Sequence, residues 1–134
     1  MPNRLKQVLF PIEPRVFCGQ RWVNIGLRCT HLVGVAGIGG GFLYGLDADS
    51  WSVYWQITVL SGVVLSLIYI WSSGAWLLEM KGLAVFLKLV LLTVGCMIPE
   101  LRPAAFILVI VLSGLIAHAP ARVRARRWLD IPTR

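Results

Sequence analysis

Long apolar runs separated by short polar turns dominate the chain from about residue 29 onward. Four such runs can be read, at about residues 29–46, 51–72, 76–98 and 103–119. About 20 apolar residues are needed to cross the hydrocarbon of a bilayer, and each run comes close to that length. The runs are continuous rather than alternating, which predicts helices and excludes a membrane β-barrel. The pattern therefore predicts an all-α, polytopic membrane protein with four spans.

The connections between the runs are short enough to favour antiparallel neighbours. The four spans are therefore expected to form an up-down-up-down four-helix bundle over residues 29–120. Residues 1–28 mix apolar and basic positions, which predicts an arm at the cytoplasmic interface of the membrane, with a disordered tail as the alternative. Residues 121–134 are rich in arginine and are expected to form a basic cytoplasmic tail.

Composition and charge agree with lipid as the solvent. Only 14% of the residues are charged, whereas a soluble domain carries about 25%. The net charge is +7, and eleven of the 13 Lys and Arg fall on the side that would hold both termini and the middle turn. This bias predicts that both termini are cytoplasmic and that the chain lies in the inner (cytoplasmic) membrane. Basic flanks of this kind indicate membrane lipids, and not nucleic acid, as partners.

The first run is unusually rich in glycine, with six glycines in residues 34–45. At about 100° per residue, one helical face is shared by His31, Gly34, Ile38, Gly41 and Gly45. Such a face lets a second helix pack through close backbone contact. The alternative is a surface for a flat ligand beside His31, either haem b or a quinone, with Gly34 and Gly41 as cofactor-binding positions.

Three ionisable residues are candidates for a site. His31 and His118 are the two histidines of the chain. An antiparallel bundle would place both near the cytoplasmic ends of their helices, where two imidazoles can ligate a haem iron; solvated interfacial histidines are the alternative. Lys88 lies within the third run, where it either serves a carboxylate, a propionate or a proton path, or snorkels to the headgroups. A site built from these residues would lie in the cytoplasmic half of the bundle.

Two motifs resemble those of known small membrane families. The first is His31 followed by Gly40, Gly41, Leu43 and Tyr44, and the second is Phe86-Leu87-Lys88-Leu89-Val90-Leu91-Leu92. Both are similar to motifs of the bacterial membrane protoporphyrinogen oxidase (HemJ) family and of the related copper-resistance CopD domain. The resemblance implies a four-helix membrane fold with a haem-linked site, in which His31 and Lys88 have the key roles. The chain departs from the family pattern at Ile38, where those families have a tryptophan.

No catalytic grouping can be read from the chain: it has no P-loop, no HExxH and no CxxC, and its three cysteines are expected to be free thiols. The sequence therefore favours a non-enzymatic subunit or assembly partner of a larger respiratory or photosynthetic membrane complex. The alternative is a haem- or quinone-associated redox protein with its site at His31, Lys88 and His118. A small transporter is a third hypothesis, and Lys88 alone supports it.

Overall fold

The computed structural model describes residues 10–11 and 13–127, and in this part the chain is built from helices. Three stretches are long and apolar enough to cross a membrane: α3 (Ala48–Ser72), α4 (Met80–Met97) and Pro99–His118, which contains α5 (Arg102–His118). For the described residues, the prediction of an all-helical chain with helices capable of crossing a membrane is confirmed. The expected arm and basic tail extend into residues 1–9, 12 and 128–134, which lie outside the described residues.

The apolar side chains of these three stretches point largely outward. Between 11 and 17% of each apolar window is buried in the protein. Exposed large side chains recur along each helix, among them Leu60, Leu67, Phe86, Leu89, Leu108 and Leu115. In water so much contiguous apolar surface would drive aggregation, whereas lipid tails cover it without cost. The outward faces of these helices therefore suit a bilayer.

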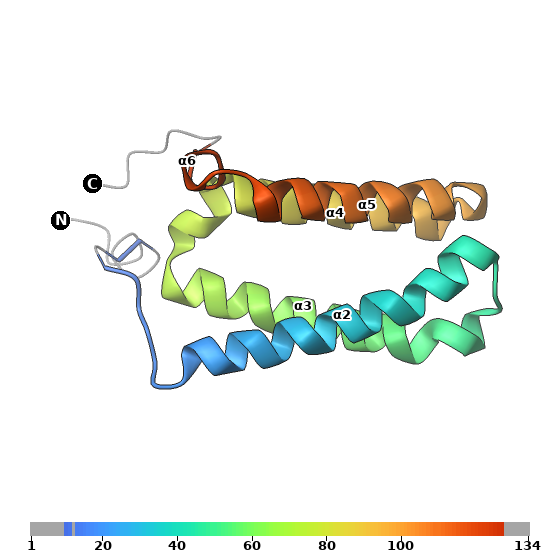
Figure 1. Cartoon of the computed structure of the whole chain (residues 1–134), viewed down its shortest axis with the longest axis horizontal. Helices are drawn as coiled ribbons and strands as arrows, with labels where there is room; N and C mark the ends of the chain where they lie inside the picture. The colour runs from blue at the N-terminus through green and yellow to red at the C-terminus, as the bar shows by residue number, and fades with distance from the viewer. Residues whose placement is uncertain (1–9, 12, 128–134) are drawn as a thin grey trace. The chain divides into compact units, whose positions relative to one another are not determined.

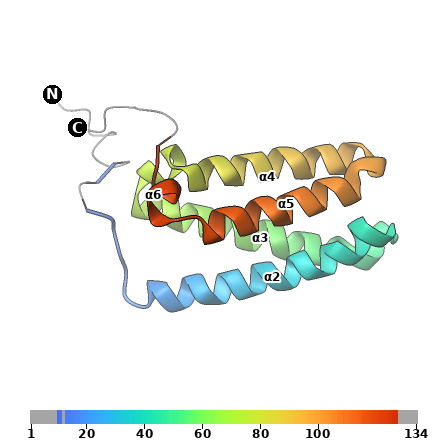
Figure 2. The same ribbon diagram turned by 45° about the horizontal axis from the view of Figure 1, so that its top comes forward.

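The chain divides into two compact units, each containing a hairpin of two long helices. The unit Pro14–Ser72 contains α2 (Gln20–Tyr44) and α3, which lie side by side and are joined by a short turn (Figures 1 and 2). The other unit comprises Met1–Glu13 and Ser73–Arg134. Its elements are the 3-10 helix η1 (Gly74–Leu78), α4, the 3-10 turn η2 (Pro99–Leu101), α5 and the short α6 (Ala121–Arg124).

Helix α2 begins earlier than the first apolar run, because local contacts start it at Gln20. Gly19 adopts a left-handed conformation with φ of 80°, which glycine tolerates without strain. The Gln20 side-chain oxygen accepts a hydrogen bond of 3.2 Å from the Phe17 backbone N–H. At the other end Gly45, with φ of 66°, caps the helix. Gly45 thus ends α2 and is not part of its helical glycine face.

The expected third span, residues 76–98, is divided at Glu79. This residue is extended and separates η1 from α4. A Cβ at Gly82 would lie 2.6 Å from the Trp76 carbonyl oxygen, so the tight approach of η1 to α4 requires a glycine. The Met80 backbone N–H donates to the Arg126 carbonyl at 3.0 Å. The segment after α6 therefore satisfies a backbone donor at the start of α4 that the helix itself leaves unpaired.

Candidate functional site

The glycine face of α2 is packed against α3. A Cβ built on Gly34 would lie 2.9 Å from both the Thr58 backbone nitrogen and the Tyr54 carbonyl oxygen. Real Cβ atoms do not approach backbone atoms so closely, and neither backbone atom can move without moving α3. At Gly34 the two helix backbones therefore approach so closely that only glycine fits.

The same pattern continues toward the turn of the hairpin. A Cβ on Gly37 would overlap the ring of Tyr54, and one on Gly41 would overlap the ring of Trp51. The contacts advance by three and four residues along α2 while they retreat by four and three along α3. This is the register of two antiparallel helices that meet along one continuous face.

The packing of this face favours one of the two interpretations of the glycines. Gly34 and Gly41 are buried, and the space above them holds Thr58, Tyr54 and Trp51 of α3. In this hairpin they therefore do not offer an open surface for haem or a quinone. Their small size instead permits close helix contact. In lipid, burial of apolar surface does not drive helices together, so this close van der Waals contact stabilises the pair.

An aromatic cluster closes the hairpin at the turn. The Phe42 ring meets Trp51 edge-on at a centroid distance of 5.4 Å and stacks with Trp55 at 6.2 Å. Phe42 is 1% exposed. The Trp51 indole N–H donates to the Leu46 carbonyl at 3.1 Å, which ties α3 to the turn. Aromatic pairs of this geometry add about 0.5–1.5 kcal/mol each beyond their buried area.

His31 is held between α2 and α3 by its Nδ1 atom. This nitrogen lies 3.0 Å from the Thr58 carbonyl oxygen and 3.0 Å from Ser61 Oγ. A carbonyl oxygen can only accept, so Nδ1 carries the proton in that contact. Gly62 leaves room for the ring, since a Cβ there would lie 3.2 Å from His31 Cε1. His31 is therefore a fixed component of the hairpin interface.

The partners of His31 form a small polar cluster within a largely apolar helix. Thr58 and Ser61 are 8% and 4% exposed. Their hydroxyls donate to carbonyls one turn earlier, Thr58 to Tyr54 at 2.8 Å and Ser61 to Ile57 at 2.6 Å. We did not predict these residues from the sequence. Their signal is the spacing of Tyr54, Thr58 and Ser61 by four and three residues, which places three polar groups on one face of an apolar helix.

Lys88 and His118 belong to the other unit and lie at different heights in it. Lys88 is half-buried near the middle of α4 and has no hydrogen-bond or ion-pair partner within the described residues. Glu79 pairs with Lys81 at 3.0 Å. His118 is exposed and is the last residue of α5.

The five predicted site residues are thus divided between the two units. His31, Gly34 and Gly41 lie together on α2 and contact the same helix, α3, while Lys88 and His118 lie in the α4–α5 hairpin. In the part of the chain that the structure describes, no group of three or more His, Cys, Asp or Glu could hold a metal ion. The haem-ligand pair of His31 and His118 stays a prediction. The expected free thiols are found, since Cys18, Cys29 and Cys96 are all free and exposed.

No protein-family model, curated protein or solved structure matches this chain. The resemblance to the HemJ and CopD families therefore stays a prediction that rests on the motif residues alone.

Proposed function

We propose that this chain is a multi-pass protein of the cytoplasmic membrane that acts as a subunit or assembly partner of a larger membrane complex. The proposal rests on the observation that the glycines and His31 of α2 face α3 within the hairpin. These residues are engaged in packing α2 on α3, while the outward faces of α3, α4 and α5 present long apolar surfaces. The exposed surface of the chain is thus largely apolar helix surface, which lipid and other membrane helices can cover.

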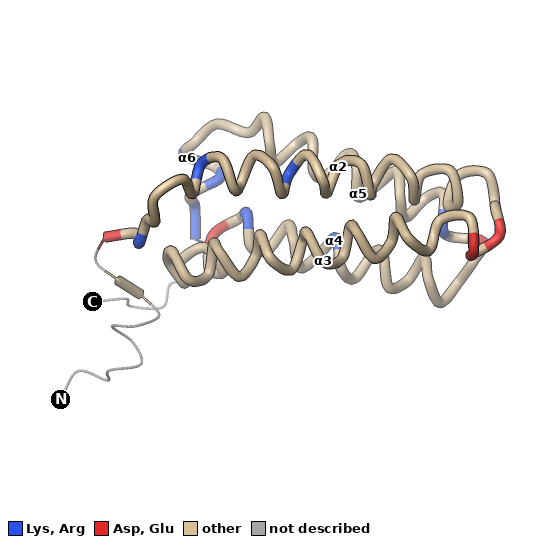
Figure 3. Tube along the Cα trace, turned by 90° about the horizontal axis from the view of Figure 1, so that it is seen from below, with Lys and Arg blue, Asp and Glu red and all other residues tan. Residues whose placement is uncertain are grey.

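The proposed arrangement is a four-helix bundle of up-down-up-down topology with α2 as a fourth span and both termini cytoplasmic. The charges of the α2–α3 hairpin support this orientation. In the α2–α3 hairpin, Asp47 and Asp49 lie in or beside the turn, while Arg21 and Arg28 lie in the first part of α2. Figure 3 shows the acidic turn at the far end of this hairpin from the basic start of α2. Basic ends on the cytoplasmic side follow the positive-inside rule.

Orientation is tested by labelling single cysteines with a membrane-impermeant maleimide in sealed right-side-out vesicles. One variant keeps Cys18 and carries Cys29→Ala and Cys96→Ala; the other is cysteine-free except for Glu100→Cys. We expect Glu100→Cys to react from outside and Cys18 to react only after permeabilisation. The reverse pattern would show that the termini face outward.

Membership of a complex is tested by extraction in a gentle detergent, native electrophoresis and mass spectrometry of the tagged full chain. We expect migration well above the 14.9 kDa chain with the same membrane proteins in constant proportion. A tagged, unrelated small membrane protein, extracted in parallel, shows which companions are non-specific. Recovery of the chain only as free monomers would contradict the subunit role.

A haem- or quinone-associated redox function is the second candidate, and the Nδ1 contact of His31 favours it. Histidines that bind a metal usually donate their other ring N–H to a carbonyl or carboxylate, as Nδ1 does here to Thr58 at 3.0 Å. The haem version predicts a Soret band in protein purified from haem-replete cells, which His31→Ala removes or shifts. A colourless preparation would exclude it.

A further inference from the structure

The α2–α3 hairpin has a basic hollow that is distinct from its glycine face. The hollow measures about 540 Å³ and lies between the first part of α2 and the last turns of α3. Its polar lining combines two arginines with three neutral side chains, namely Arg21, Arg28, Gln20, Asn24 and Tyr69. Since no carboxylate is among the lining residues, the two positive charges of the hollow are not neutralised within it.

The arrangement of these side chains follows from the spacing along α2. Arg21, Asn24 and Arg28 are separated by three and four residues, so they lie on one helical face. The Arg28 guanidinium donates to the Tyr69 hydroxyl of α3, which orients it across the two helices. The Asn24 side-chain oxygen is buried and has no hydrogen-bond partner among the described residues. Two cationic donors therefore line the hollow, and a buried acceptor without a partner lies beside them.

One wall of the hollow is a fixed extended segment. Val16 lines the hollow, and its neighbour Arg15 is tied to the end of α3 by two hydrogen bonds. The Arg15 backbone N–H donates to the Ser72 carbonyl at 2.9 Å, and the Ser72 hydroxyl donates to the Arg15 carbonyl at 2.7 Å. The Phe17 and Trp71 rings meet at a centroid distance of 6.0 Å. The segment before α2 thus packs against the end of α3 through hydrogen bonds and a ring contact.

The charge of the hollow is also uncompensated within the rest of its hairpin. The carboxylates of residues 14–72 are Asp47 and Asp49, which lie beyond the far end of α2. Arg21 and Arg28 lie 23 and 16 residues before the end of α2 at Tyr44, which is about 35 and 24 Å along the helix and at least about three times the Debye length of about 8 Å at physiological ionic strength. The two acids therefore do not neutralise Arg21 and Arg28 through solvent, and an anionic ligand can do so.

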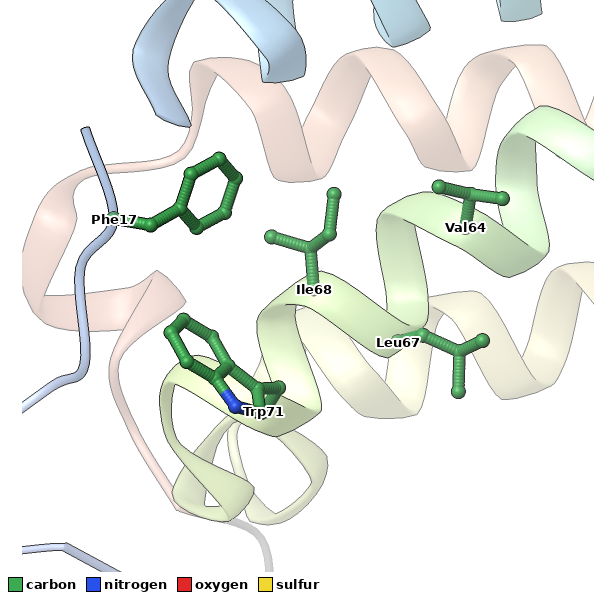
Figure 4. A pocket seen from close by; sticks show the side chains of 5 residues that line it. All are labelled: Phe17, Val64, Leu67, Ile68 and Trp71. Carbon is green, nitrogen blue, oxygen red and sulfur yellow. The ribbon is translucent and has the colours of Figure 1, made fainter. Parts of the chain in front are cut away.

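An apolar groove lies at the same end of the hairpin. Figure 4 shows Phe17 of the extended segment facing Ile68 and Trp71 of α3, with Val64 and Leu67 farther along the helix. Consecutive residues line the two features, since Val16 and Tyr69 line the basic hollow whereas Phe17 and Ile68 line the groove. The two features share no lining residue, so the basic hollow carries the inference and the groove adds apolar surface at the same end of the hairpin.

From these observations we infer that the hollow binds the phosphodiester headgroup of an anionic membrane lipid. Arg21 and Arg28 contact the phosphate through their guanidinium groups. Arginine suits this role because its planar fork can bind two phosphate oxygens at once. Basic pockets on the cytoplasmic side of helix bundles bind such headgroups in general. The inference rests on the membrane placement proposed above, and it adds a defined lipid site to it.

The test is native mass spectrometry of the detergent-purified full chain, titrated with phosphatidylglycerol and, separately, with phosphatidylcholine. We expect one tightly bound phosphatidylglycerol and clearly weaker binding of the zwitterionic lipid. Arg21→Gln with Arg28→Gln should weaken phosphatidylglycerol binding by about 30-fold, since each basic residue near an anionic headgroup contributes about a fivefold factor. Arg21→Lys with Arg28→Lys keeps the charge but loses the planar fork, so its loss of affinity should be clearly smaller than that of the double Gln variant but still measurable.

The matched control removes two arginines from the other unit. Arg122 and Arg126 are exposed, and replacing both by Gln lowers the net charge equally without touching the hollow. We expect less than about a threefold loss of phosphatidylglycerol binding, because diffuse surface charge is screened at physiological ionic strength. Equal losses in the two double variants, or equal binding of the two lipids by the wild type, would overturn the proposed site.

Two further readings keep the test decisive. Wild-type binding of phosphatidylglycerol should weaken when the salt concentration is raised, because the Debye length falls from about 10 Å at 0.1 M to about 3 Å at 1 M. Binding that does not change with salt would contradict a phosphate site. This measurement needs no variant, so it does not depend on whether the variants fold. Inorganic phosphate that displaces the lipid at equal concentration would assign the hollow to a free anion instead. Because both readings use the isolated chain in detergent, they are independent of its orientation and of any complex.

Discussion

A single glycine decides how closely α2 and α3 can approach. At Gly34 an added Cβ would lie 2.9 Å from two backbone atoms of α3, so relief requires the helices to separate. We expect Gly34→Ala to destabilise the protein by about 1–3 kcal/mol, as overpacking of a closely fitted interface does. The measurement is the free energy of unfolding from a titration with sodium dodecyl sulfate in mixed micelles.

Gly26 provides the matched control for this substitution on the same helix. A Cβ there would meet no atom within 4 Å. Gly26→Ala should therefore leave stability unchanged or raise it by about 0.5–1 kcal/mol, because alanine loses less backbone entropy than glycine in a helix. Equal effects of the two substitutions would show that helix propensity, and not contact with α3, governs Gly34.

The contribution of the contact between His31 and Ser61 to stability can also be measured. Its Nδ1 to Oγ distance is 3.0 Å, and the two side chains come from different helices. A double-mutant cycle with His31→Ala and Ser61→Ala should give a coupling free energy of about 0.6 kcal/mol, the average for interhelical hydrogen bonds in a membrane protein. Strictly additive single effects would mean that the contact does not contribute to stability.

Among the long helices, α2 differs from the others in how it can enter a membrane. The helices α3 and α4 have mean hydropathies of 1.8 over their apolar windows, whereas α2 is not among the stretches that reach membrane-spanning hydropathy. Its glycines add no apolar side chain, and Arg28 and His31 are polar. The α2 helix is therefore expected to depend on α3 as a partner, through the glycine face and the His31 contacts.

This dependence gives a prediction at the scale of elements. In a glycosylation-based insertion assay with microsomes, the isolated segment Gln20–Tyr44 should insert less efficiently than the isolated segment Ala48–Ser72. The continuous segment 20–72 should restore insertion of α2. Efficient insertion of α2 on its own would show that it does not need its hairpin partner.

At the scale of the whole molecule, the distribution of Lys and Arg is expected to fix the orientation. Asp47→Lys, Asp49→Lys and Glu100→Lys together add three cations to the side that otherwise carries Arg102. A measurable fraction of molecules should then expose Cys18 to external maleimide. The control with Asn, Asn and Gln at these positions removes the acids alone, and orientation should not change because acids contribute little. Identical labelling of both variants would contradict control by basic residues.

Much of the fold could be predicted because lipid imposes simple requirements on a sequence. Apolar runs of about 20 residues have to be helical to satisfy their backbone groups in hydrocarbon, so the helices around residues 51–72 and 103–119 were found close to their observed limits. The start of α2 at Gln20 and the break at Glu79 were not found. Both depend on local contacts, namely the Gln20 side chain with Phe17 and the approach of Gly82 to Trp76.

Helical structure, apolar character and asymmetric charge could all be predicted from the sequence, because hydropathy and charge are properties of the residues and not of their neighbours. The sequence also showed that the first run has a glycine face beside His31. What covers that face depends on the packing of the helices, since the same small residues can admit a ligand or a helix. Thr58, Tyr54 and Trp51 cover it, and the antiparallel register that brings them there is set by the α2–α3 turn. That same pairing places Arg28 against Tyr69 and creates the basic hollow.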